Sequence, residues 1–178
     1  MSVFHSNTEM LIDYWRSHAF LSAPIDPAAF APLAPQVFLL GRNGPGSYAF
    51  RLAGGLVRDL FARDLRGTSA LELWRPRDAA PLRTALESAR RRPEPLVAQA
   101  HALTEHAALP VEVLFAPLGG DGIRAERILG LVQPLTMVAR LRGEPVRRLA
   151  LEHLCSAGPA NEPAPHLRLA ALNGRRIA

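Results

Sequence analysis

Residues 110–118 read PVEVLFAPL, and this stretch decides the fold of the chain. Val111, Val113 and Phe115 lie on one face of an extended chain and the residues between them on the other, because successive side chains of a β-strand alternate. A short turn separates this stretch from an apolar run at 96–104, and a glycine-rich loop leads from it to another run at 127–133. The pattern therefore predicts three consecutive β-strands.

A second group of strands is predicted nearer the N-terminus. Residues 36–40 and 48–53 have strand patterns, and the Asn-Gly-Pro-Gly at 43–46 between them is typical of a turn, which predicts a β-hairpin. Between the two groups we expect a short helix after Gly55 and a longer one after Asp78, whose side chain would cap it. Strands on both sides of a helical insert predict an α+β domain, with an antiparallel sheet and helices on one face.

The longer helix is rich in arginine. Glu87 lies four residues from both Arg83 and Arg91, a spacing that predicts ion pairs on the exposed face of a helix. Arg90 and Arg92 complete a basic last turn, where cations complement the negative end of the helix dipole. These features explain the arginine run without a nucleic-acid ligand.

An amphipathic helix is predicted near the N-terminus. Ser6 and Glu9 have the spacing of a capping box. The apolar stripe that follows is made of Met10, Leu11, Tyr14 and Trp15. This stripe could pack on its own domain or form a dimer or partner surface, and we favour the second because a Tyr-Trp pair is a good interface anchor.

Composition excludes several functions. All 21 basic residues are arginine, so a Walker A loop, a Schiff-base lysine and a pyridoxal-phosphate site are ruled out. Residues 1–135 hold 14 arginines and 13 acidic residues, whereas residues 136–178 hold 7 and 3, so most of the net charge of +5 lies in the C-terminal segment. That segment has no aromatic residue for base stacking, and we therefore expect no nucleic-acid partner.

The sequence also bears on localisation. No apolar stretch approaches the ~20 residues of a membrane span, so we expect none. Glu9 and Asp13 interrupt the place where the apolar core of a signal peptide would lie. Cys155 is the single cysteine and cannot form an internal disulfide, which is typical of a reducing compartment. We expect a cytoplasmic protein.

Several short words occur in order along residues 10–135. They are Tyr14-Trp15-Arg16, Ile25-Asp26-Pro27, Val37-Phe38-Leu39-Leu40, Phe50-Arg51-Leu52-Ala53-Gly54, LFARDLRG at 60–67, LWRPRD at 73–78, EVLFAPL at 112–118 and Ile128-Leu129-Gly130. With their order of elements, these words resemble a PAS domain, and more narrowly a bacterial family of small stand-alone PAS proteins.

The resemblance implies a PAS fold, in which helices cover the concave face of a five-stranded antiparallel sheet and enclose a small cavity. It also implies that the outer face of the sheet or a flanking N-terminal helix makes dimer and partner contacts. The residues expected to line the cavity are Leu52, Leu56, Leu60, Phe61, Trp74, Leu82, Leu86, Val113, Phe115, Leu129 and Leu131.

Three arginines are expected at the mouth of this cavity. Arg51, Arg63 and Arg66 would either hold an anionic ligand there or form ion pairs with neighbouring acids such as Asp59, Asp64 or Glu72, and we favour the ion pairs.

The residues restrict the cofactors that a PAS domain could hold here. A light-sensing flavin domain needs a cysteine beside the flavin ring, but Cys155 lies outside the PAS region. A haem needs an axial ligand, usually histidine, and none occurs between residues 42 and 92. His101 and His106 lack further ligands nearby in sequence for a zinc site. We predict no covalent flavin, no haem and no metal, and leave an unidentified small ligand open.

We divide the chain into an N-terminal helix and linker (1–24), a PAS domain (25–135) and a basic, Pro/Ala-containing extension (136–178). The predicted function is a non-enzymatic sensory or regulatory module, which forms a homodimer and signals through a protein partner. The alternative is a small-molecule enzyme on a cone-shaped α+β scaffold, which requires an inward carboxylate. Glu112 alternates with Val113 and is a poor candidate for that carboxylate.

Overall fold

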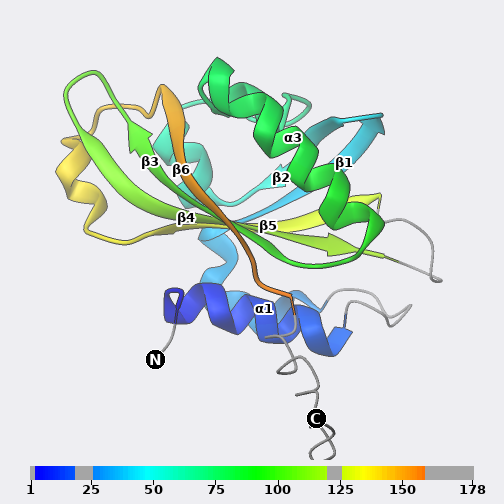
Figure 1. Ribbon diagram of the computed structural model, residues 1–178. Helices are drawn as coiled ribbons and strands as arrows, with labels where there is room; N and C mark the ends of the chain where they lie inside the picture. The colour runs from blue at the N-terminus through cyan, green and yellow to red at the C-terminus, as the bar shows by residue number, and fades with distance from the viewer. Residues whose placement is uncertain (1–2, 19–25, 120–125, 159–178) are drawn as a thin grey trace, which may run out of the picture.

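The computed structural model describes residues 3–18, 26–119 and 126–158 (Figure 1). Its six strands form one antiparallel sheet in the order β2-β1-β5-β4-β3-β6. The elements in chain order are α1 (Ser6–His18), η1 (Pro27–Gln36), β1 (Val37–Gly44), β2 (Ser47–Ala53), α2 (Gly55–Phe61), η2 (Ala70–Leu73), α3 (Pro76–Arg91), β3 (Leu96–Leu103), β4 (Ala108–Leu118), β5 (Arg127–Pro134), η3 (Val138–Leu141) and β6 (Arg148–Ser156). The predicted α+β class and antiparallel sheet are confirmed.

Helices lie on both faces of the sheet. α3 crosses one face and α1 lies against the other, as Figure 1 shows. Each helix buries its apolar side, which produces two core clusters separated by the sheet. β4 contributes to both, because Val113 and Phe115 face the α3 side whereas Leu114 and Ala116 face α1. The alternation predicted for residues 110–118 is confirmed.

The sheet has one strand more than the five expected. Residues 148–156 form β6, which pairs with β3 at one edge of the sheet. The start of α3 holds this strand, since the Arg75 amide donates to the Leu149 carbonyl at 2.9 Å and the Leu151 amide donates to Asp78 Oδ2 at 3.0 Å. Asp78 therefore does not cap α3 as expected, and it satisfies an amide of β6 instead.

The N-terminal helix begins with a different cap from the one predicted. The Asn7 amide donates to Nδ1 of His5 at 3.2 Å, so His5 takes the capping role expected of Ser6. By contrast, the predicted cap at Asp26 is present, because Asp26 Oδ1 accepts a 2.9 Å hydrogen bond from the Ala28 amide. None of the helices in the described ranges is both long and apolar enough to cross a membrane.

Candidate functional site

Most of the predicted cavity residues lie together on the α3 side of the sheet. The seven that share this core are Leu60, Phe61, Trp74, Leu82, Leu86, Val113 and Phe115, with Leu56 packed against them. Leu52 is 51% exposed, while Leu129 and Leu131 lie beneath α1 on the opposite face. β5 is apolar on both faces, so apolar character alone could not separate Leu129 and Leu131 from the residues that face α3.

Aromatic rings occupy the centre of the α3 side. The ring centroid of Phe38 lies 5.5 Å from that of Phe50 and 5.9 Å from that of Phe115, and Trp74 continues the row at 6.4 Å from Phe115. Gly130 on β5 is the register partner of both Phe38 and Phe115, and a Cβ there would collide with the Phe38 ring. Because Gly130 has no side chain, the Phe38 ring can pack directly over its Cα atom.

A basic pocket lies on the surface beside α2. Its volume is about 890 Å³, and its walls are Leu52, Ala53, Arg58, Asp59, Ala62, Arg63, Asp64 and Arg66. Ala62 ends α2 in the left-handed conformation, at φ 48°, and residues on both sides of this turn line the pocket. We call it the arginine pocket.

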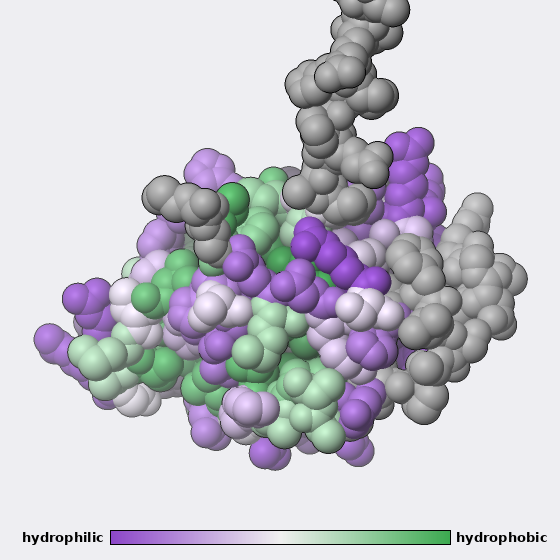
Figure 2. Space-filling model, turned by 90° about the horizontal axis from the view of Figure 1, so that it is seen from below, coloured by the Kyte–Doolittle hydropathy of each residue, from purple (hydrophilic) through white to green (hydrophobic). Residues whose placement is uncertain are grey.

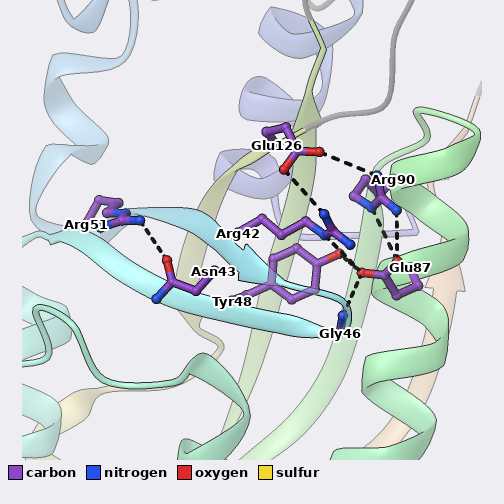
Figure 3. A network of polar contacts seen from close by, with 8 residues as sticks. All are labelled: Arg42, Asn43, Gly46, Tyr48, Arg51, Glu87, Arg90 and Glu126. Carbon is purple, nitrogen blue, oxygen red and sulfur yellow. Dashed lines mark hydrogen bonds and ion pairs between the residues drawn. The ribbon is translucent and has the colours of Figure 1, made fainter.

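The arginines of the arginine pocket are exposed. Within the described ranges, Arg58, Arg63 and Arg66 have no ion-pair partner, so the expected pairs with nearby acids do not form there. Arg51 lies apart from this pocket, and its Nη2 donates a 2.7 Å hydrogen bond to Asn43 Oδ1 (Figure 3). The structure thus brings Arg63 and Arg66 together, and adds Arg58 in place of Arg51.

A buried carboxylate lies on the other face of the sheet, beneath α1. Glu112 is 3% exposed. It accepts hydrogen bonds from the His5 amide at 3.1 and 3.2 Å and from the Thr8 hydroxyl at 2.6 Å. Nearby, Asn7 Nδ2 donates to Gln133 Oε1 at 2.9 Å. These bonds tie the first turn of α1 to β4 and β5.

The apolar stripe of α1 packs on its own domain. Leu11 is fully buried and Trp15 is 3% exposed, with the indole Nε1 donating to the Pro117 carbonyl at 2.6 Å. Tyr14 is half-buried and Met10 is 49% exposed. Figure 2, which views the molecule from the α1 side, shows apolar and polar residues interspersed over this surface. Of the predicted interface set, Met10 and Tyr14 remain available on the surface, whereas Leu11 and Trp15 do not.

A polar network joins α3 to the hairpin of β1 and β2 (Figure 3). Glu87 Oε1 accepts hydrogen bonds from the Tyr48 hydroxyl at 2.6 Å and from the Gly46 amide at 3.2 Å. Its Oε2 accepts from Arg90 Nε at 3.3 Å and Nη2 at 3.0 Å. Glu87 therefore turns toward the hairpin, and not toward Arg83 and Arg91 on the outer face of the helix.

Electrostatics follow from this arrangement. Burial alone would raise the pKa of Glu87, but hydrogen bonds from Tyr48, Arg90 and the Gly46 amide outweigh burial and lower the pKa from 4.5 to about 2. Burial and the bond to Glu87 raise the pKa of Tyr48 well above its ordinary value. Arg90, expected to complement the helix dipole in a basic last turn, is 3% exposed and donates two hydrogen bonds to Glu87.

The histidines make pairwise contacts. His101 Nδ1 lies 3.1 Å from Glu152 Oε1, and His106 Nδ1 lies 2.9 Å from Glu144 Oε1. Among the described residues, no group of three or more His, Cys, Asp or Glu side chains is placed to hold a metal ion.

Sequence reasoning missed Arg58, Glu112 as a helix anchor, and the contact of Tyr48 with Glu87. Arg58 had a signal, since it lies on the same short helical segment as Leu56 and Leu60 and close to Arg63 in sequence. The contact between Tyr48 and Glu87 had none, because the two residues are 39 positions apart and meet only when α3 packs on the hairpin.

An antiparallel sheet with helices packed across one face and an N-terminal helix against the other agrees with the PAS fold that the sequence resemblance implies. A family model described as "PAS domain" matches residues 3–133, and the chain belongs to this family. The match includes all of α1 and ends at Gln133, one residue before the end of β5.

The solved structures that match the chain include LOV proteins. The Rhodobacter sphaeroides LOV protein is 14% identical with a TM-score of 0.47, and the match covers 78% of this chain and 72% of that chain. The d2 variant of RsLOV is also 14% identical, with a TM-score of 0.46 and coverage of 78% and 72%. No curated protein matches the chain.

Proposed function

We propose that the chain is a non-enzymatic sensory or regulatory module, which acts in signal transduction by contact with a protein partner and is switched by a small anionic ligand. Membership of the PAS family supports the sensory class. The ligand must be argued from the site, because one fold hosts many functions.

The arginine pocket is the observation that carries the ligand class. Three guanidinium groups without ion-pair partners among the described residues line one pocket with two carboxylates, so the local charge is positive. Guanidinium groups bind phosphate and carboxylate groups through paired hydrogen bonds. We place the ligand in the arginine pocket and not between the sheet and α3. The space between the sheet and α3 is filled by packed aromatic rings, which are those of Phe50, Phe38, Phe115 and Trp74.

The position of Glu112 favours this function over the enzyme alternative. An acid–base enzyme on this scaffold would need a carboxylate on the α3 side of the sheet whose pKa is raised. The two carboxylates described above on that side are Asp78, which accepts a hydrogen bond from the Leu151 amide, and Glu87, whose pKa is lowered by its hydrogen bonds. Glu112 is buried on the opposite face, and both its oxygens accept hydrogen bonds from the start of α1. Its contacts are those of a residue that anchors a helix.

We also propose a cytoplasmic homodimer with no nucleic-acid partner. Met10 and Tyr14 support a contact on the outer side of α1, since they are the members of the predicted set that retain exposed surface. The charge distribution supports the absence of a nucleic-acid partner, because the PAS region is nearly neutral.

Mass spectrometry of the gently released native protein tests the ligand proposal. We expect an added mass that is lost in the Arg63→Gln/Arg66→Gln variant. The Arg91→Gln/Arg92→Gln variant removes the same charge from the exposed end of α3 and should keep the added mass. An added mass that survives in both variants would contradict the assignment to the arginine pocket.

A further inference from the structure

Glu126 lies across two guanidinium groups at the end of the polar network. Its Oε2 is 3.6 Å from Arg42 Nη1 and its Oε1 is 3.7 Å from Arg90 Nη1 (Figure 3). Both distances exceed hydrogen-bond length, so the contacts are loose ion pairs. The Glu126 side chain is 62% exposed, although its backbone is held by a 3.0 Å hydrogen bond from the Arg42 amide to the Glu126 carbonyl.

Of the two arginines beneath Glu126, Arg90 is buried and Arg42 is half-buried. The Arg90 side chain is 4% exposed and that of Arg42 is 19% exposed. Taking a guanidinium group out of water is costly unless its charge is paired and its N–H groups are hydrogen-bonded. These two side chains therefore need anionic partners more than a surface arginine does.

The other acidic residue of the network, Glu87, carries one negative charge for the two arginines. Glu87 is half-buried, and Arg90 holds it through two hydrogen bonds. Arg42 Nε lies 3.7 Å from Glu87 Oε1 and, within the described ranges, has no hydrogen-bond partner although it is buried. Among the described residues, the second positive charge is thus compensated by loose contacts alone, one of Arg42 with Glu87 and those of both arginines with Glu126.

We propose that Arg42 and Arg90 form a recognition site for a carboxylate, which Glu126 occupies in the isolated chain and which an external carboxylate takes over. A guanidinium group prefers a carboxylate at about 2.7–2.9 Å. The tethered Glu126 does not reach that distance from either Nη1 atom, whereas a carboxylate that is not held by the backbone at the start of β5 lacks this restraint. The carboxylate comes either from an acidic side chain of a protein partner or from a small dicarboxylate.

This site is separate from the arginine pocket. It lies between β1, α3 and the start of β5, and shares no residue with that pocket. Its test is therefore independent of the ligand proposed above.

Titration of the full chain, followed by the NMR signals of the Arg42 and Arg90 side chains, tests the proposal. The probes are succinate and a capped tetraglutamate peptide. Glu126→Gln removes the competing carboxylate and should tighten binding about two- to fivefold. Arg42→Gln should weaken it about tenfold or more. Arg91→Gln, an equal charge change on the exposed side of α3, should leave it unchanged.

The two probes distinguish the sources of the carboxylate. Binding of succinate to the Glu126→Gln variant identifies a small dicarboxylate, and binding of the peptide alone identifies an acidic protein segment. If Arg42→Gln does not fold, the Glu126→Gln variant still tests the proposal, because the Glu126 side chain is exposed and its replacement should leave the fold intact. Arg42 and Arg90 signals that respond to neither probe in Glu126→Gln, or affinities equal to those of the unchanged chain, would overturn the proposal.

Discussion

The hydroxyl of Thr8 donates a 2.6 Å hydrogen bond to a carboxylate oxygen of Glu112. The two residues are 104 positions apart, and their contact closes α1 over the outer face of the sheet. Both are buried, and the start of the helix supplies hydrogen-bond donors to the Glu112 carboxylate. The N-terminal helix is therefore part of the domain that it covers.

Thr8→Val tests this anchor because valine keeps the shape of threonine and removes the hydroxyl. The variant leaves the buried carboxylate without one donor, and we expect the free energy of unfolding to fall by about 1–3 kcal/mol. Urea denaturation measures the change. Ser17→Ala removes an exposed hydroxyl of the same helix and should change stability by less than about 0.5 kcal/mol. Equal effects of the two substitutions would count against the anchor.

Trp15→Ala separates a core role from an interface role. Because Trp15 is buried in its own domain, we expect a loss of about 3–5 kcal/mol in unfolding free energy. Met10→Ala, on the exposed side of α1, should have little effect on stability. Chemical denaturation and light scattering give stability and mass together. A stable Trp15→Ala protein with a halved mass would show that Trp15 belongs to an interface after all.

Gly130→Ala tests the packing of the aromatic row. A Cβ at position 130 meets the Phe38 ring, so we expect destabilisation by about 1–3 kcal/mol. Gly55→Ala is the matched control, since a Cβ there meets no atom within 4 Å. Phe38→Leu should relieve part of the cost of Gly130→Ala in a double-mutant cycle. If the stability changes of Gly130→Ala and Phe38→Leu simply add in the double variant, the Phe38 ring does not contact position 130.

The pKa of Glu87 predicts a pH dependence of stability. The folded pKa of about 2 lies below the ordinary value of 4.5, so the network stabilises the fold fully above about pH 4.5 and loses this contribution as the pH falls toward 2. The stability difference between the unchanged chain and Glu87→Gln should therefore shrink over that range. Tyr48→Phe removes one donor and should move the loss to higher pH. Parallel stability curves for the unchanged chain and Glu87→Gln would contradict the network.

Local patterns predicted much of this fold. The alternation at 110–118 placed Val113 and Phe115 on one face and Leu114 on the other, because a strand forces this alternation whatever lies around it. The helix cap at Asp26, which precedes a proline, was also predictable from local sequence. The amide that donates to the Asp26 side chain belongs to Ala28, only two residues away. Such features depend on neighbours in sequence.

Features that depend on distant partners were not predictable in the same way. Residues 148–156 mix Arg148, Glu152 and His153 with apolar residues, and they become a strand only because β3 offers an unpaired edge. The spacing of Glu87 predicts ion pairs along the helix, because sequence spacing reveals only neighbours on the same helix. Its actual partner, Tyr48, arrives from β2 when the helix packs.

The central claim is that Arg58, Arg63 and Arg66 bind an anion, and calorimetric titration with inorganic pyrophosphate tests it most directly. We expect saturable binding that weakens about tenfold or more in Arg63→Gln/Arg66→Gln and is unchanged in Arg91→Gln/Arg92→Gln. Equal weakening in both variants would indicate only a response to net charge. That result, or no binding at low ionic strength, would contradict the claim.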